Sequence, residues 1–273
     1  MLYAGSCLQA VIRIGLAGLI CEAGFVCYFD WTERWDAYAG AVGAASQSRI
    51  DTNTIFSHVD GVIVVSQELA DEAASMGLRC LHLPNAVSDQ FIEALAQENP
   101  DEPIQLKSIP EPRVIHVGSY NSAWIHWDWL IRAASENPEI SFCMLGGGGI
   151  ETVPDKMPSN IYLLGRVAYE DIPSCLRYSH GCMLLYKVEA TSAGDPTKLY
   201  EYLATGLPVV SSPHPRCLEF EKYIYIADNA TEFAEQIRLA LGEGREAAQL
   251  RIDEARRHTW SLRAQSLMEW LGQ

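Results

Sequence analysis

The sequence has few basic residues and no long apolar run. Its 273 residues include 20 Lys and Arg against 35 Asp and Glu, giving a formal net charge of −15. This charge argues against binding to a phosphate backbone, so an anionic ligand requires a local binding device. The apolar stretch 14–21 is far shorter than the roughly 20 residues that span a bilayer. Arg13 before it fits a signal peptide, but no clean Ala-x-Ala site follows. We interpret it as a buried helix that feeds a strand at 25–29.

Signatures of low complexity and of metal binding are also missing. The 20 Gly and 13 Pro are too few for a low-complexity chain, and an apolar content of 48% is too high for a disordered one. The eight cysteines show no Cys-x-x-Cys spacing and no associated His cluster. We therefore expect buried thiols in a reducing compartment.

From Gly61 onward, short apolar runs alternate with amphipathic stretches, which is the pattern of βα units around a parallel sheet. Strands are predicted at 61–65, 80–83, 114–117, 140–145, 161–164, 182–185, 208–211 and 223–226. Helices are predicted between Ser66 and Gly77 and at 88–97, 127–136, 171–178, 196–204, 231–242, 245–257 and 261–271.

A proline-rich segment separates two regions of this pattern. Residues 98–112 contain four prolines among mostly polar residues, which sustain neither a helix nor a central strand. We expect an N-terminal α/β domain over 1–110 that ends in this linker, with too few strands for an independent doubly wound sheet. A complete doubly wound domain is expected over 111–257, and a terminal helix over 258–273 that crosses back to the N-terminal part.

The helix predicted at 196–204 has well-marked ends. Asp195 suits the N-cap and Pro196 the first helical position, because the first turn has unpaired N–H groups. Gly206 suits the left-handed residue that ends a helix, and Pro208 prevents its continuation.

Two charged residues lie on one face of this helix. Lys198 falls in the first turn, where unpaired N–H groups, the positive end of the helix dipole and an ammonium together form an anion site. Glu201 follows one turn later, and its carboxylate can accept hydrogen bonds from a ribose diol. The pair suits a nucleoside diphosphate, but the same spacing also describes a surface Lys–Glu ion pair.

The segment resembles the nucleotide-sugar motif of GT-B-fold glycosyltransferases, P-x-K-x-x-E-Y-L-A-x-G-x-P-V-V. The residues in register are Pro196, Lys198, Glu201, Tyr202, Leu203, Ala204, Gly206, Pro208, Val209 and Val210. Residues 29–40 resemble the Y-D-x-x-D-D-W-x-x-F-x-G stretch of bacterial GT-B enzymes that build cell-surface polysaccharides. Further similar pieces occur in the same order at 60–66, 83–86, 114–118, 161–167 and 258–260.

The resemblance implies an α/β, GT-B-like fold with a complete C-terminal Rossmann-like domain and a partial, acceptor-side N-terminal domain. It implies transfer of a sugar from a nucleotide-diphosphate sugar to a saccharide or lipid-linked acceptor, in surface polysaccharide synthesis. It implies no cofactor and no metal, and the sequence has no Asp-x-Asp motif that would bind one. It also implies a cytoplasmic protein with at most peripheral contact at the inner membrane face.

The resemblance also assigns residues to the donor site. Glu201 matches the glutamate that binds the ribose hydroxyls, and Lys198 is a partner for the diphosphate. Residues 194–197 match a loop whose backbone approaches the diphosphate, and residues 166–167 match a turn beside the nucleobase. The donor-binding residues implied in this way are Gly118, Arg166, Val167, Gly194, Asp195, Thr197, Lys198 and Glu201. The glycine run 146–149 either allows close backbone approach or forms a flexible loop.

The catalytic residue is less clearly marked. Retaining relatives carry an acid eight residues before the ribose-binding glutamate, and Ala193 occupies that position here. Glu189 is the nearest acid before this position and is the candidate catalytic residue. The loop 119–125 has no Lys or Arg, where many relatives place a phosphate-binding base.

The likeness begins near the end of the N-terminal domain of such enzymes. Their early Gly-rich loop and the Asp or His base of inverting members have no counterpart here. We therefore expect a separate N-terminal half as a partner, and little or no transferase activity from this chain alone. Two alternatives remain open: a non-catalytic nucleotide-sugar-binding fragment or half of a split enzyme, and a sugar-nucleotide epimerase of GT-B fold.

Several aromatic and His residues are predicted to be structural. Trp124, Trp127 and Trp129 flank His126 at a helix start, which favours core packing or a lid over a sugar-stacking platform. His116 on an apolar strand is interpreted as a core residue. His214 follows the end of a strand, where such sheets bind ligands, so a site role stays open for it.

Overall fold

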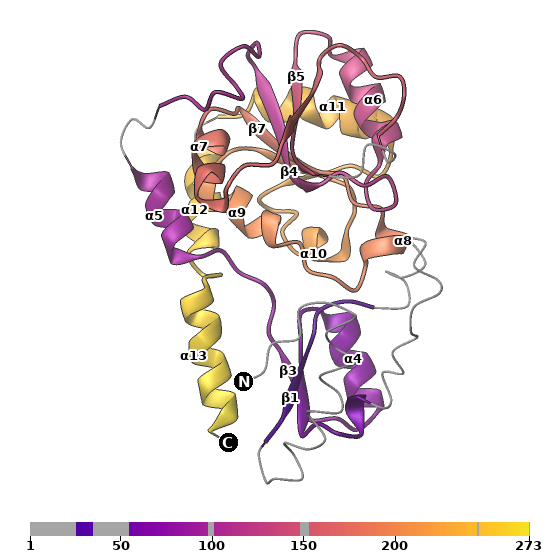
Figure 1. Ribbon diagram of the computed structural model, residues 1–273, viewed down its shortest axis with the longest axis vertical. Coiled ribbons are helices and arrows are strands. Elements are labelled where there is room, and N and C mark those ends of the chain that lie inside the picture. Colours follow the sequence, from indigo (N-terminus) through magenta and orange to yellow (C-terminus); the bar gives the residue numbers. More distant parts are fainter. Residues whose placement is uncertain (1–25, 35–54, 98–100, 148–152, 245, 273) are drawn as a thin grey trace. The chain divides into compact units, whose positions relative to one another are not determined.

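The computed structural model describes residues 26–34, 55–97, 101–147, 153–244 and 246–272 (Figure 1). The expected N-terminal helix, the second half of the 29–40 motif, and Gly148 and Gly149 lie outside these residues. The chain forms two compact units. Unit 1 comprises Met1–Asn85, Ala193–Asp195 and Arg263–Gln273, and unit 2 comprises Ala86–Ser192 and Pro196–Leu262.

Unit 1 contains a three-stranded parallel sheet in the order β1-β2-β3. Its strands are β1 (Tyr28–Trp31), β2 (Gly61–Val64) and β3 (Cys80–His82). Helix α4 (Gln67–Ser75) begins as expected at Ser66, whose hydroxyl accepts a hydrogen bond from the Leu69 N–H. Leu69 and Ala73 are the buried residues of this helix, and they pack with apolar side chains of β1 and β2.

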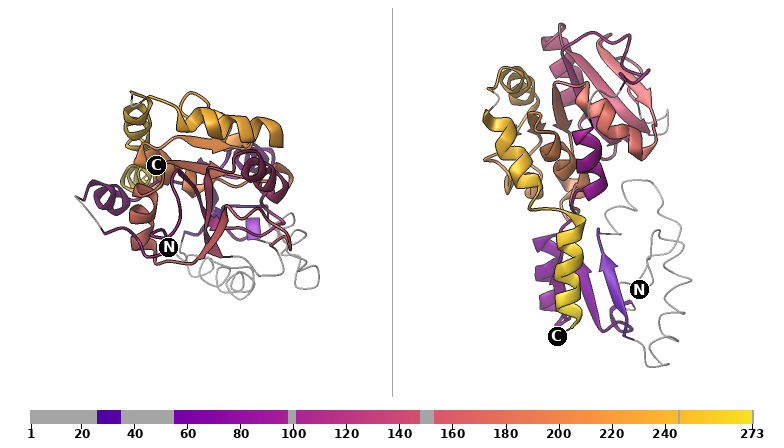
Figure 2. Two further views of the ribbon diagram at one scale, coloured as in Figure 1. Left: turned by 90° about the horizontal axis from the view of Figure 1, so that it is seen from above. Right: turned by 90° about the vertical axis from the view of Figure 1, so that its left-hand side faces the viewer.

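The end of helix α13 (Trp260–Leu271) belongs to unit 1. The Trp270 ring lies 4.8 Å from the Tyr28 ring, and the Arg79 guanidinium lies 4.2 Å from the centre of the indole. Arg79 also donates a hydrogen bond to the Trp270 carbonyl at 2.7 Å. The last residues of the chain therefore pack on residues from its beginning, and Figure 2 shows this helix running beside the strands of unit 1.

Unit 2 contains a six-stranded parallel sheet in the order β6-β5-β4-β7-β8-β9. Its strands are β4 (Arg113–Ser119), β5 (Ser141–Gly147), β6 (Ile161–Gly165), β7 (Gly181–Leu184), β8 (Val209–Ser211) and β9 (Tyr225–Ile226). The order places the first strand, β4, in the interior of the sheet, as in doubly wound folds.

Helices cover both faces of this sheet (Figures 1 and 2). Side chains of α6 (Trp127–Glu136) and α11 (Ala230–Leu241) fill one core. Side chains of α5 (Asp89–Ala96), α7 (Ile172–Arg177), α9 (Thr197–Thr205) and α12 (Glu246–Ala255) fill the other. Three short helices, η2 (Tyr169–Asp171), α8 (Val188–Thr191) and α10 (Pro215–Leu218), were not predicted, because so few residues show no helical period.

The proline-rich segment is part of unit 2. Leu106 and Ile109 are buried in its core, and Arg113 pairs with Glu102 at 2.7 Å. The boundary between the compact units consequently lies at Asn85, earlier than the expected position near residue 110. The prolines prevent regular structure, but two apolar side chains of the segment are buried in the core of unit 2.

A buried arginine joins α12 to the end of α9. The side chain of Arg251 is 2% exposed and pairs with Glu243 at 2.5 Å. It also donates hydrogen bonds to the carbonyls of Tyr223 (2.7 Å) and Gly206 (3.0 Å). The charge is therefore paired and hydrogen-bonded, the condition under which a buried arginine is tolerated.

No helix in the described part of the chain is both long enough and apolar enough to cross a membrane.

Candidate functional site

The sheet of unit 2 opens at the carboxyl end of β4. The pairing of β4 with β7 covers only Val114–Ile115, after which the two strands separate. The Tyr202 hydroxyl accepts a hydrogen bond from the Val117 N–H at 2.7 Å, in place of a strand partner. The chain leaves β4 for α6 on one face of the sheet and leaves its neighbour β7 for α9 on the other face, and ligands of doubly wound sheets bind at such switch points.

Glycines at the carboxyl ends of β4 and β5 let the backbones of these neighbouring strands approach closely. Gly118 and Gly146 have φ values of +146° and +144°, which side chains rarely tolerate. A Cβ on Gly146 would lie 1.9 Å from the Gly118 carbonyl oxygen, and one on Gly147 would lie 2.4 Å from Arg166 Nε. The first two glycines of the predicted run therefore allow close approach of backbone and side chain.

Glu201 is the central charged residue of the site. It is fully buried, and the Tyr169 hydroxyl donates a hydrogen bond to its Oε1 at 2.9 Å. The Lys198 Nζ lies 3.1 Å from Oε2 as an ion-pair partner, and Oε2 accepts no hydrogen bond within the described residues. Because Glu201 is buried, this is not the surface ion pair that the spacing also permitted. Leaving such an oxygen without a hydrogen bond costs about 1–3 kcal/mol, which favours a ligand donor there.

The protonation state of Tyr169 follows from its surroundings. Burial, together with the negative charge of Glu201, raises the pKa of Tyr169 to about 12. The phenol is therefore protonated at neutral pH and acts as the donor in its hydrogen bond to Glu201.

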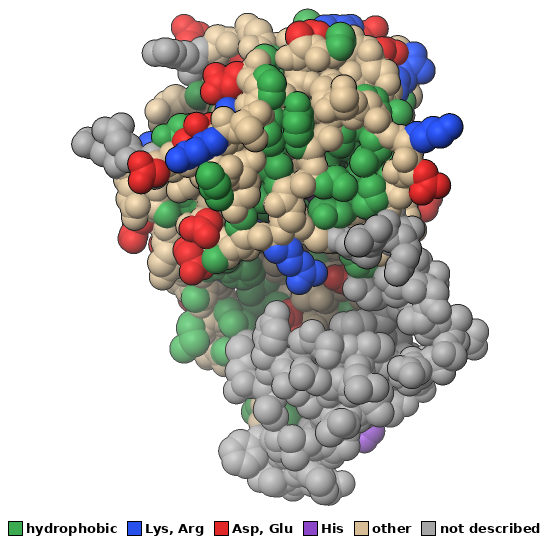
Figure 3. Space-filling model, turned by 45° about the horizontal axis from the view of Figure 1, so that its top comes forward, with side chains coloured by type: hydrophobic (Ala, Val, Ile, Leu, Met, Phe, Trp, Pro, Cys, Tyr) green, Lys and Arg blue, Asp and Glu red, His purple; other side chains and the backbone are tan. Residues whose placement is uncertain are grey.

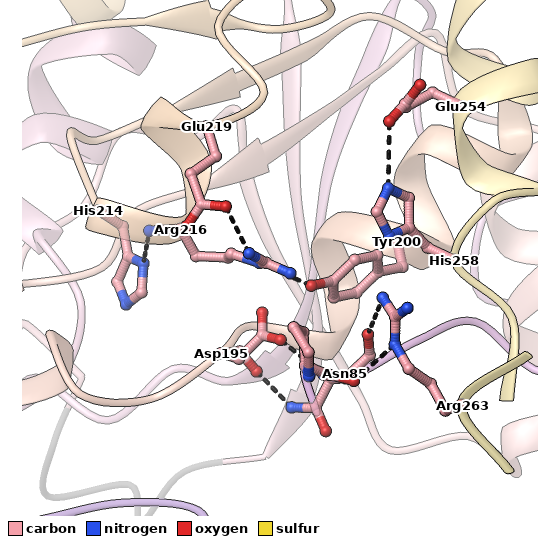
Figure 4. Close-up of polar contacts among 10 residues, drawn as sticks. Asn85, Asp195, Tyr200, His214, Arg216, Glu219, Glu254, His258 and Arg263 are labelled. Carbon is pink, nitrogen blue, oxygen red and sulfur yellow. Dashed lines mark hydrogen bonds and ion pairs between the residues drawn. The ribbon is translucent and has the colours of Figure 1, made fainter. Parts of the chain in front are cut away.

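The start of α9 differs from the expectation. The helix begins at Thr197 with Pro196 at the N-cap, and no side chain caps it. Asp195 was expected to be the cap, but its carboxylate accepts a hydrogen bond from the Asn85 N–H at 2.6 Å within unit 1 (Figure 4). The Asn85 side-chain amide in turn donates to the Asp195 carbonyl at 2.6 Å. The helix start therefore keeps N–H groups that no side chain caps, which preserves its capacity to bind an anion.

The remaining donor-site candidates occupy different places. Arg166 and Val167 directly follow β6, and Arg166 is exposed and makes no ion pair or hydrogen bond with the described residues. Gly194 lies with Asp195 in unit 1, whereas Thr197 opens α9 in unit 2. The structure thus brings Lys198 and Glu201 together directly, and places the other unit 2 candidates at strand or helix ends.

Glu189, the catalytic candidate, is exposed on the short helix α8. Within the described residues it pairs with neither Lys198 nor Glu201. Burial lowers the pKa of His126, and the negative charges of Asp128 and Glu189 offset part of this decrease.

The tryptophans near the start of α6 serve the core. Trp127 and Trp129 are buried, and the Trp127 indole donates a hydrogen bond to the Tyr120 carbonyl at 2.9 Å. The His126 ring stacks on Trp129 at 4.4 Å. These contacts support the predicted packing role over a sugar-stacking platform.

The side chains of two buried histidines contact backbone carbonyls at the carboxyl end of the sheet. His116 Nδ1 lies 3.2 Å from the Met183 carbonyl, and Nε2 lies 3.3 Å from that of Ser119. His214 Nδ1 accepts a hydrogen bond from the Arg216 N–H, so its Nε2–H donates to the Thr191 carbonyl at 3.0 Å. Burial lowers the pKa of both imidazoles. Both rings are therefore neutral, and both are occupied by structural contacts.

Arg216 is similarly occupied near His214. It donates hydrogen bonds to the Tyr200 hydroxyl at 2.7 Å and to the Glu219 carboxylate at 2.5 Å (Figure 4). On the face of unit 2 drawn in Figure 3, basic and acidic side chains lie in separate small groups, with no continuous basic surface. An anionic ligand thus depends on local groups such as Lys198 and the start of α9.

Sequence reasoning missed Tyr169. No motif marked it, and its partner Glu201 is 32 positions away. The only available signal was its place shortly after the predicted nucleobase turn at 166–167.

Comparisons with known proteins agree with this architecture. The profile of the family described as "Glycosyl transferase-like" matches residues 126–269, more than half of the chain. An uncharacterized glycosyltransferase of Methanosarcina acetivorans is 27% identical over 182 residues, which cover 65% of this chain and 43% of that protein. The chain thus spans less than half the length of this curated relative.

Solved structures share the fold at low sequence identity. HepE of Anabaena, solved with UDP-glucose, superposes with a TM-score of 0.73 at 17% identity, over 99% of this chain and 78% of that one. WaaG, a glycosyltransferase of lipopolysaccharide biosynthesis, gives a TM-score of 0.61 at 13% identity, over 84% of this chain and 69% of that one. The predicted α/β, GT-B-like fold is thereby confirmed. With the profile match, the chain belongs to the glycosyl transferase-like family.

Proposed function

We propose that unit 2 binds a nucleotide-diphosphate sugar at the carboxyl end of its sheet, and that the protein transfers the sugar to a saccharide or lipid-linked acceptor. The observation that carries this proposal is Glu201, a buried carboxylate whose Oε2 accepts no hydrogen bond among the described residues. A ribose hydroxyl supplies the missing donor.

The start of α9 suits the diphosphate. Lys198 lies in the first turn, 3.1 Å from Glu201 Oε2, so one short stretch of helix carries groups for both ribose and phosphate. The uncapped N–H groups and the ammonium stabilise negative charge on the departing diphosphate. Gly194, Asp195 and Thr197 are proposed as further backbone contacts, on the basis of their place in the sequence motif.

The other candidates complete the proposed donor site. Gly118 and Gly146 permit close backbone approach beside β4, and the backbone of Arg166 and Val167 is proposed to face the nucleobase. Glu189 is proposed as the catalytic carboxylate. Because it has no ion-pair partner among the described residues, no neighbouring cation in this part of the chain neutralises it.

We propose that the nucleobase of the sugar donor is uracil. The support is that HepE was solved with UDP and UDP-glucose, and that a similar Burkholderia xenovorans trehalose-phosphate synthase is UDP-forming. A role in surface polysaccharide synthesis in the cytoplasm is supported by the motif at residues 29–40 and by the fold shared with WaaG.

Isothermal titration calorimetry with UDP, ADP and GDP tests the donor site. UDP should bind, and Glu201→Gln should weaken its binding by about 1–3 kcal/mol through loss of charge-assisted hydrogen bonds. Glu246→Gln, at an exposed glutamate of α12, is the matched control and should bind UDP as the parent protein does. Unchanged UDP affinity in Glu201→Gln would contradict the assignment of Glu201.

A further inference from the structure

Tyr169 connects two segments of the candidate donor site. It opens η2, shortly after the turn at 166–167, and its ring packs 5.8 Å from the Phe91 ring. Its hydroxyl donates to Glu201 Oε1 at 2.9 Å. The side chain is 49% exposed, whereas the carboxylate that it contacts is fully buried. Tyr169 thus extends from the surface to a buried charge on α9.

This contact makes the two oxygens of Glu201 different. Oε1 is held by the phenol, which is a donor at neutral pH because the pKa of Tyr169 is raised. Oε2 faces the Lys198 ammonium at 3.1 Å but accepts no hydrogen bond within the described residues. A carboxylate held at one oxygen has lost much of its freedom to rotate, so its other oxygen presents an acceptor in a fixed direction.

We propose that Tyr169 is a positioning residue that holds Glu201 so that Oε2 receives a hydroxyl of the bound ribose. This inference rests on the proposed function, since it assumes that Glu201 binds the ribose. Tyr169 acts through Glu201 and determines how strongly the site prefers a ribose with its hydroxyls over one without them.

The experiment compares UDP with 2′,3′-dideoxy-UDP by isothermal titration calorimetry, in the full chain and in Tyr169→Phe, Glu201→Gln and the double variant. Tyr169→Phe should lower UDP affinity by about three- to ten-fold, the effect of about one hydrogen bond, and leave dideoxy-UDP affinity unchanged. In the Glu201→Gln background, Tyr169→Phe should have no further effect, because the two residues act as one unit.

Tyr162→Phe is the matched control. Tyr162 lies on β6, is half-buried, and makes no hydrogen bond with the described residues, so its variant should keep the preference of the parent protein for UDP. If Tyr169→Phe does not fold, Tyr169→Leu provides a second test with the same expected loss of preference.

The outcomes separate this inference from the proposed function. A normal preference for UDP in Tyr169→Phe, with a lost preference in Glu201→Gln, would overturn the role of Tyr169 alone. An equal effect of Tyr169→Phe with and without Glu201→Gln would also overturn it, since the tyrosine would then contact the ligand directly. A normal preference in Glu201→Gln would overturn both this inference and the ribose site.

Discussion

Two buried ion pairs in unit 2, Arg251–Glu243 and Lys198–Glu201, are satisfied to different degrees. Arg251 donates to Glu243 and to two backbone carbonyls, so each of its three side-chain nitrogens donates at least one hydrogen bond. Glu201 lies beside Lys198 in an equally buried place, yet its Oε2 accepts no hydrogen bond within the described residues. A fully hydrogen-bonded buried pair leaves no polar atom unsatisfied, whereas a pair with an unsatisfied oxygen can still accept a hydrogen bond from a ligand, at a cost in stability. The difference distinguishes the scaffold of unit 2 from its candidate site.

The largest expected effect comes from breaking the satisfied pair. Arg251→Ala should lower the free energy of unfolding by about 3–5 kcal/mol, because it leaves the Glu243 carboxylate partly buried without its partner. Chemical denaturation measures this loss. Arg256→Ala, at a side chain that is 61% exposed, is the control and should change stability little. A similar stability for both variants would show that the hydrogen bonds of Arg251 are not required to keep Glu243 stable in the fold.

A second test compares adjacent glycines at the site end of the sheet. Gly146→Ala should cost about 2–4 kcal/mol, because its Cβ meets the Gly118 backbone at 1.9 Å and its φ is +144°. Gly147→Ala should cost much less, since its Cβ meets only the end of the flexible Arg166 side chain. Thermal unfolding of both variants checks this, and equal losses would show that backbone approach at Gly146 is not required.

The smallest expected effect is a pH dependence from His116 and His214. Both have a pKa in the folded protein below the unfolded value of about 6.5, because burial disfavours the charged ring. Below pH 6.5 the unfolded chain takes up protons that the folded chain does not, so their contribution to stability is complete above pH 6.5 and decreases as the pH falls. The slope is at most about 1.4 kcal/mol per pH unit for each ring.

Denaturation between pH 5 and pH 8 measures this slope. His116→Gln should flatten the curve below pH 6.5, because it removes a buried imidazole whose pKa is lowered. A steeper curve in His116→Gln would contradict the buried neutral imidazole.

Local patterns predicted most elements of the fold. The helix predicted at 127–136 has those bounds as α6, and the left-handed Gly206 ends α9 as its sequence context indicates. Errors arose where a distant partner decided the outcome. Asp195 has the propensity of an N-cap, but the Asn85 N–H competes for its carboxylate. The proline-rich segment lacks regular structure, and nothing local indicates that Leu106 and Ile109 are buried.

The candidate site was partly predictable for the same reason. Lys198 and Glu201 are three positions apart on one helix, so their proximity follows from helical geometry. Tyr169 reaches Glu201 only through the packing of the β6–α7 connection against α9, which no local spacing encodes. The satisfied pair of Arg251 and Glu243 was missed as well, although the two are eight positions apart, because a turn lies between them.

Two adjacent residues of α9 contact different parts of unit 2, which matters for any redesign of this helix. Glu201 faces Lys198 and Tyr169, while Tyr202 supports the Val117 N–H where β4 leaves β7. A motif exchanged for that of a glycosyltransferase would therefore replace the proposed ribose contact and a support of the sheet in one step. A swap intended to change donor choice should retain Tyr202 as the acceptor for the Val117 N–H and include the residue at 169, or be assembled one residue at a time.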